Sequence, residues 1–162
     1  MTPHIVILGI GNLLLSDDGA GVHAARVLAA DPPRGAEIVD AGTDVLSALP
    51  FLEQATHAII IDAVRGGGEP GALYRLSEAD LSPRGGACTA HAVNVLAARH
   101  LSPPGSPWPE ISILGVEPAN LDLGTDLSPA VAAALPRLAS LARKQVAAWH
   151  SASAYSNPGR CA

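Results

Sequence analysis

One segment of the chain is typical of a strand that is buried on both faces of a sheet. Residues 57–64 have the sequence HAIIIDAV, a nearly continuous apolar run without the alternation of a half-exposed strand. Strands of this kind belong to parallel sheets whose two faces are both covered by helices. The run therefore predicts an α/β architecture, in which strands and helices alternate along the chain.

Four further segments have the composition of strands, and helical patterns separate most of them. Three are short and apolar, and the fourth alternates as an edge strand does; they span residues 4–10, 37–40, 110–116 and 72–76. We expect a single three-layer domain over residues 1–150, with a twisted, five-stranded, mostly parallel sheet and helices on both faces.

Capping residues and periodicity predict where the helices begin and which sides face the core. A helix over residues 90–101 is expected to direct Val93, Leu96 and Ala97 inward. Pro136 predicts a kink or a break in the last helix. Residues 151–162 have no apolar pattern, so a disordered tail is expected there. The expected caps are Thr43 or Asp44, Thr89, and Ser128 followed by Pro129.

The composition argues against several classes of protein. A net charge of −5, with no Lys/Arg cluster, disfavours nucleic acid or an anionic membrane as a partner. No apolar run approaches the roughly 20 residues of a membrane span, and no signal-peptide pattern is present. Two cysteines, Cys88 and Cys161, do not form a disulfide framework pattern. We expect a cytoplasmic protein and, because no segment indicates an interface, a monomer.

Polar residues follow the predicted strands at the edge where open α/β sheets bind ligands. Asp17 and Asp18 follow the first strand, Asp62 ends the third, and His91 begins a helix. Either of the first two is explained equally well as a helix cap. Asp62 is harder to explain as a cap, because it ends an apolar run and a carboxylate is costly to bury there without a partner. Two carboxylates and an imidazole suit a divalent ion such as nickel or zinc and leave coordination positions open.

Other kinds of site have weaker support. Gly9-x-Gly11 resembles the start of a dinucleotide-binding fingerprint, but Leu14 occupies the third glycine position and the adjoining aspartates would repel a pyrophosphate. Cys88 would be a nucleophile only beside a base, and an idle thiol is the commoner case. No GxSxG, HExxH or Walker A pattern occurs.

Four segments, taken in order, resemble the hydrogenase maturation proteases: ILGIGNLLLSDDGAGVHAARVL, IIIDAV, CTAHAVNVL and ISILGVEP. The resemblance extends from about His4 to Trp149. It implies an endopeptidase that removes the C-terminal extension from the nickel-loaded precursor of a nickel–iron hydrogenase large subunit. It also implies that the nickel arrives with the precursor as a recognition element and is bound by Asp18, Asp62 and His91, without an organic cofactor.

The resemblance also suggests roles for single residues. Asp40, Gly42 and Thr43 belong to a loop that the family uses to choose its precursor. Many members have Glu at the position of Asp18, whose shorter side chain changes the reach of the carboxylate. Either the nickel polarises the scissile carbonyl or activates a water, or Asp18 or Asp62 acts as general base. The lack of a recognisable nucleophile favours attack by water. Two alternatives stay open: a nickel-sensing chaperone that binds the precursor without cutting it, and a self-sufficient small metallopeptidase.

Overall fold

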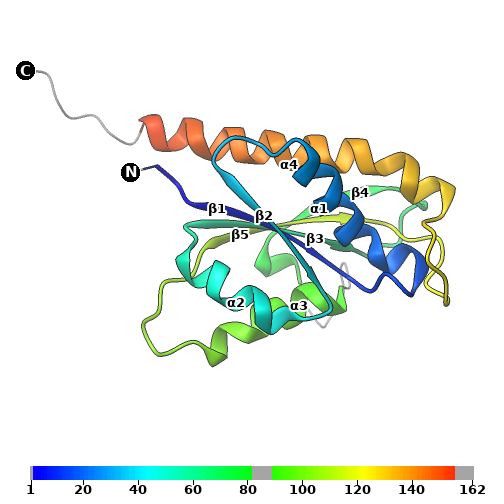
Figure 1. Cartoon of the computed structure of the whole chain (residues 1–162), viewed down its shortest axis with the longest axis horizontal. Coiled ribbons are helices and arrows are strands. Elements are labelled where there is room, and N and C mark those ends of the chain that lie inside the picture. The colour runs from blue at the N-terminus through cyan, green and yellow to red at the C-terminus, as the bar shows by residue number, and fades with distance from the viewer. Residues whose placement is uncertain (1, 82–88, 156–162) are drawn as a thin grey trace, which may run out of the picture.

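The computed structural model describes residues 2–81 and 89–155 and contains a five-stranded sheet between two layers of helices (Figure 1). The strand order is β2-β1-β3-β5-β4. All neighbouring pairs are parallel except β4 and β5, which are antiparallel at one edge. This confirms the predicted α/β class and the predicted edge strand. The strands are β1 (Ile5–Ile10), β2 (Ala36–Gly42), β3 (His57–Ala63), β4 (Leu73–Leu76) and β5 (Glu110–Val116).

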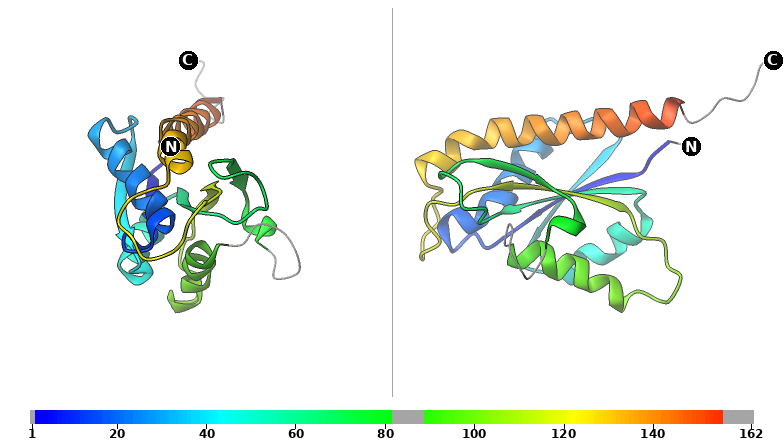
Figure 2. Two further views of the ribbon diagram at one scale, coloured as in Figure 1. Left: turned by 90° about the vertical axis from the view of Figure 1, so that its right-hand side faces the viewer. Right: turned by 180° about the vertical axis from the view of Figure 1, so that it is seen from behind.

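Helices cover both faces of the sheet (Figures 1 and 2). One face carries α1 (Ala20–Ala30) and α4 (Pro129–Tyr155), and the other carries α2 (Val45–Gln54) and α3 (Ala90–Ala98). Within the described parts of the chain, no helix combines the length and the apolar character needed to cross a bilayer.

The sheet separates two apolar cores. Alternate residues of β1 point to opposite faces, so that Ile7 packs on the α1–α4 side and Leu8 on the α2–α3 side. Every residue of β1 is buried, as are the five central residues of β3. Because both faces are covered, these strands need apolar residues at consecutive positions, which explains the run that first indicated the fold.

The predicted inward face of α3 is wrong for two of its three residues. Val93 and Ala97 are exposed, Leu96 is half-buried, and the residues that face the core are Ala92, Val95 and Ala98. Almost every residue of α3 is apolar, so the sequence contains little polar contrast to fix the orientation of the helix. The capping predictions hold: the side chains of Asp44, Thr89 and Ser128 accept hydrogen bonds from first-turn amides of their helices.

The last helix is longer and more continuous than predicted. It runs through Pro136 without a break, and Pro136 lies on its solvent side. Its final turn includes residues 151–155, so the first part of the expected tail continues the helix. Residues 156–162 lie outside the described residues.

Helix α1 lies unusually close to the sheet at Gly21. A Cβ atom there would be 2.1 Å from the carbonyl oxygen of Ile61 and 2.3 Å from that of Ile10. Both obstacles are backbone atoms of central strands, which have no rotamer to change. Gly21 therefore sets the spacing at which the turn before α1, with Asp18, meets the carboxyl ends of β1 and β3.

We predict that Gly21→Ala destabilises the protein, although alanine favours a helix interior by about 1 kcal/mol over glycine. Overpacking against fixed backbone typically costs about 1–3 kcal/mol or more, so the steric cost wins. Chemical denaturation measures the free energy of unfolding, with Ala29→Ser on the exposed side of α1 as control. An unchanged or increased stability of Gly21→Ala would contradict this packing.

Candidate functional site

Asp62 is a fully buried carboxylate whose two oxygens are both occupied. Its Oδ1 accepts a hydrogen bond from the amide of Ala63 at 2.9 Å and lies 3.3 Å from Nδ1 of His91. Its Oδ2 accepts from the hydroxyl of Thr89 and from the amide of Ala92. These donors offset the cost of burying the charge, and they join the end of β3 to the beginning of α3.

Asp18 lies on the other side of the same imidazole. Its Oδ2 is 3.7 Å from Nε2 of His91 and accepts a hydrogen bond from the amide of Asn12 at 3.0 Å. Gly11, at φ +136°, brings the backbone so close to Asp18 that a Cβ atom would meet the aspartate's carbonyl oxygen. The structure thus brings together the three residues predicted as a site, with His91 between two carboxylates.

The carboxylates change the proton affinity of the imidazole. The hydrogen bond with Asp62 raises the pKa of His91; burial lowers it, and the charges of Asp62 and Asp18 raise it further. Burial raises the pKa of Asp62, against the hydrogen bonds from His91 and Thr89. The hydrogen bond between them couples the titration of Asp62 and His91, and Asp18 lies on the other side of the imidazole.

The same residues have the chemical groups that bind a divalent ion, but these groups are not arranged around one point. Carboxylate oxygens and an imidazole nitrogen are ordinary ligands of nickel and zinc. However, Asp62 and Asp18 lie at different nitrogens of the ring, and no three His, Cys, Asp or Glu residues in the described ranges converge on one point as metal ligands. An ion bound by all three requires the His91 ring to turn, so the metal trio stays a prediction.

A small cavity opens in front of this network. It has a volume of about 220 Å³, and Asp62 lies beneath its wall without reaching the surface. Asp18 is therefore the carboxylate that a substrate in the cavity would meet. The lining residues are Asp18, Ala63, Arg65, Thr89, His91, Pro118 and Leu121.

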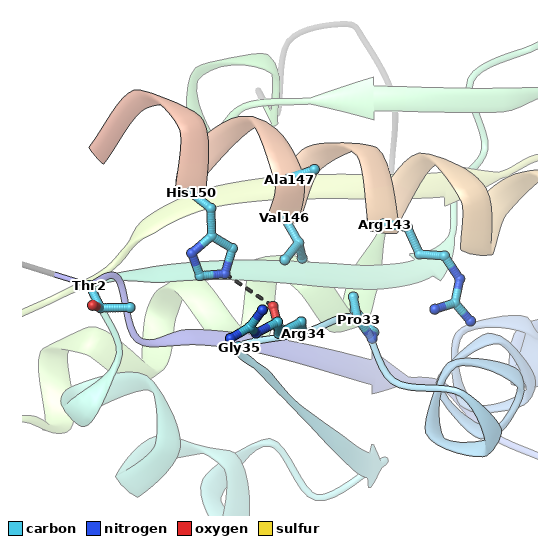
Figure 3. Close-up of a pocket in the computed structure, with 8 residues that line it drawn as sticks. All are labelled: Thr2, Pro33, Arg34, Gly35, Arg143, Val146, Ala147 and His150. Atoms are coloured by element: carbon cyan, nitrogen blue, oxygen red, sulfur yellow. Dashed lines mark hydrogen bonds between the residues drawn. The ribbon is translucent and has the colours of Figure 1, made fainter. Parts of the chain in front are cut away.

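A larger cavity, of about 650 Å³, lies at the other end of the parallel strands, where these strands begin (Figure 3). Its lining includes Pro33 and Gly35, which precede β2, and His150 near the end of α4. In Figure 3, His150 points toward the backbone carbonyl of Arg34, 3.1 Å from its Nε2. No carboxylate lines this cavity, and it does not contain the predicted site residues.

Asp17 has a different role from its neighbour. It is completely buried, and its carboxylate accepts hydrogen bonds from the amides of Ala119 at 2.8 Å, Asn120 at 2.9 Å and Ser128 at 2.7 Å. It fastens the turn that follows β1 to the loop that follows β5. As possible helix caps Asp17 and Asp18 are equivalent in the sequence, because the partners of Asp17 lie about a hundred residues away along the chain.

A third buried acid, Glu117, follows β5. It accepts hydrogen bonds from the hydroxyl of Tyr74 at 2.6 Å and from the amide of Gly66 at 2.7 Å. Burial acts to raise the pKa of Glu117, but the donors, Tyr74 foremost, outweigh it and lower this pKa. Glu117 thus holds the loop after β3 against the edge strand β4.

The predicted recognition loop lies at the same edge of the sheet. Asp40 forms an ion pair with Arg26 at 3.2 Å, and Gly42, at φ +52°, accepts a hydrogen bond from the amide of Gly11 at 2.9 Å. This bond links the Asp40–Thr43 segment to the turn that carries Asp18. A role for Asp40, Gly42 and Thr43 in choosing a precursor remains a prediction. Cys88 and Cys161 lie outside the described residues.

Comparison with known proteins gives a consistent picture. Residues 22–145 match the family described as hydrogenase maturation protease. The hydrogenase expression/formation protein HupD of Rhodobacter capsulatus is 33% identical over 153 residues, covering 90% of this chain and 72% of that protein. The NiFe hydrogenase maturation protease HybD of Thermococcus kodakarensis superposes with a TM-score of 0.75 at 28% identity, over 88% of this chain and 99% of that one. The hydrogenase maturating endopeptidase HybD of E. coli gives 0.71 at 27% identity, over 86% and 89%.

The family match and the shared fold together identify a peptidase of the α/β class, and its carboxylates and imidazole lie at the carboxyl ends of the parallel strands. The matched residues cover most of the domain, from the first helix into the last. The chain belongs to the hydrogenase maturation protease family.

We predict that Asp17→Asn and Asp18→Asn differ in what they damage. Both oxygens of Asp17 accept hydrogen bonds from backbone amides, and asparagine replaces one of these oxygens with an NH₂ group that cannot accept. Asp17→Asn should therefore lower the free energy of unfolding by about 1–3 kcal/mol. Asp18→Asn keeps an oxygen for the amide of Asn12 and should change stability less. Urea denaturation of both variants checks the difference, and equal losses would contradict the separate roles assigned to the two aspartates.

We also predict a pH dependence of stability that arises from Glu117. Its pKa is lower in the folded protein, so its contribution is complete above about pH 4.3, the ordinary glutamate value, and disappears as the pH falls through the lowered pKa. Glu117→Gln should therefore be less stable than wild type at neutral pH and approach it in acid. Thermal unfolding across pH measures this, with the exposed Glu69→Gln as control; parallel curves for Glu117→Gln and wild type would contradict it.

Proposed function

We propose that this protein is the endopeptidase that removes the C-terminal extension of a nickel–iron hydrogenase large-subunit precursor, with the precursor's nickel as recognition element. The observation that carries the proposal is the Asp18–His91–Asp62 network beside a cavity, in a chain of the hydrogenase maturation protease family. The names of the relatives supply the substrate class, since HybD of Thermococcus kodakarensis is a NiFe hydrogenase maturation protease.

The network supports a specific way of recognising the metal. The imidazole of His91 lies between two carboxyl groups, 3.3 Å from Asp62 and 3.7 Å from Asp18. A divalent ion carried by the precursor would bind among these groups, and the two carboxylates would balance its charge. Because the ion belongs to the substrate, a precursor without nickel would leave these groups without the ion that they recognise.

The geometry favours Asp18 over Asp62 as the group that meets the attacking water. Asp18 lines the cavity, whereas Asp62 is buried and engaged at both oxygens. Asp18 would accept the proton of a water that attacks the scissile carbonyl. Asp62 would hold His91 in position through Nδ1, as carboxylates commonly do behind histidines that bind metals.

Two alternatives predict different products from the same site. A nickel-sensing chaperone would bind the precursor and release it with its mass unchanged. A self-sufficient metallopeptidase would bind its own ion and cut short peptides without a folded precursor. The family membership favours the specific endopeptidase, and we place it in the cytoplasm as a monomer.

We predict that only the nickel-loaded precursor loses a C-terminal peptide when the protein is added, as measured by intact-mass spectrometry. Asp18→Ala and His91→Ala should lower the rate at least about 100-fold, the usual contribution of an acid–base group. Asp62→Ala should have a similar effect, with some loss of stability because Thr89 and Ala92 lose their acceptor.

Asp31→Ala and His150→Ala are matched controls, because both residues lie at the other end of the parallel strands. They should cut at the wild-type rate. Binding of the precursor without any change of mass would replace the endopeptidase with the chaperone. Cutting of short peptides in the absence of precursor would favour the metallopeptidase.

A further inference from the structure

Two leucines are strongly exposed on two loops that contribute residues to the cavity lined by Asp18 and His91. Leu14 is 62% exposed and Leu123 is 85% exposed. They belong to different loops, one after β1 and one after β5, which lie side by side: the loop after β5 is yellow in Figure 1. The amide of Gly124 donates to the carbonyl of Leu14 at 3.0 Å, and the amide of Ser16 donates to the carbonyl of Gly124 at 2.8 Å.

The exposure of these leucines does not come from loosely attached loops. Asp17 binds two amides of the second loop, and the hydroxyl of Ser16 donates to the carbonyl of Asp122 at 3.0 Å. The loops therefore behave as one pinned unit that holds both side chains in water. A large apolar side chain held in water gives up the stabilisation that its burial would provide, and here two such side chains belong to one fixed pair of loops.

The second loop also contributes a leucine to the cavity. Leu121, on the same loop as Leu123, lines the cavity together with Asp18 and His91. Leu121 is half-buried. A polypeptide whose scissile bond lies beside Asp18 would meet Leu121 in the cavity, on the loop that continues to Leu123 and is hydrogen-bonded to the carbonyl of Leu14.

We propose that Leu14, Leu121 and Leu123, here named the leucine rim, bind apolar side chains of the precursor next to the bond that is cut. The proposal rests on the proposed function and specifies the kind of substrate segment that the site accepts: an extended, apolar one. The occupant is the precursor, because one member of the rim, Leu121, lines the same cavity as Asp18 and His91. A second copy of this chain on the rim would instead close the cavity to any polypeptide.

The test compares the double variant Leu14→Ser/Leu123→Ser with wild type. Both side chains are exposed, so the thermal midpoint should move little. The Kd for the nickel-loaded large-subunit precursor, measured by calorimetry, and the KM for its cleavage should each rise at least about tenfold, because two leucines lose their burial on binding. Leu101→Ser is the matched control: Leu101 is 64% exposed but lies beyond the far end of α3.

Separate measurements of binding and cleavage keep the two proposals distinguishable. If wild type binds the precursor but never cuts it, and the double variant loses binding, the leucine rim stands while the endopeptidase falls. If the double variant binds and cuts as wild type does, or if Leu101→Ser is equally impaired, the rim is wrong. A wild-type dimer that the double variant converts to monomers would also overturn it.

Discussion

The buried carboxylate of Asp62 determines how the rest of the site is arranged. Removing a charge from water costs several kcal/mol, so the structure must supply hydrogen-bond donors to Asp62 at the end of β3. It does so with the Ala63 amide, the Thr89 hydroxyl, the Ala92 amide and the imidazole of His91. Three of these donors come from the start of α3. The position of that helix against the sheet is therefore coupled to the charge, and the orientation of His91 follows from both.

Much of the fold could be predicted because its signals are local. A parallel strand covered on both faces needs consecutive apolar residues, and the segment 57–64 has them. Caps are local as well, which is why Asp44, Thr89 and Ser128 were found. The inward face of α3 was not predicted correctly, because the sequence of a helix that is apolar nearly all round contains no information about its orientation. Pro136 was expected to disturb α4, but its ring faces water and the surrounding packing keeps the helix continuous.

The candidate site could be predicted in its members but not in its geometry. The rule that ligands bind at the carboxyl ends of parallel strands selected Asp18, Asp62 and His91, and these do meet. The position of the imidazole between the two carboxylates depends on the directions of the side chains. The spacing of the residues along the sequence does not specify these directions. The separate role of Asp17 depends on amides about a hundred residues away. The exposure of Leu14 and Leu123 is likewise invisible in a sequence where most leucines are core residues.

The contributions to the site are spread along the chain. Asp18 comes from the first eighth, Asp62 and His91 from the middle, and the wall formed by Pro118 and Leu121 from a later loop that Asp17 fixes through backbone amides. A piece that ends before residue 118 therefore contains both carboxylates and the imidazole but neither residue of that wall. The reacting groups are synthesised first, and the cavity in front of them is complete only after the loop that follows β5 has folded against Asp17. For an enzyme that would cut another cellular protein, this late assembly is a safeguard built into the order of the strands.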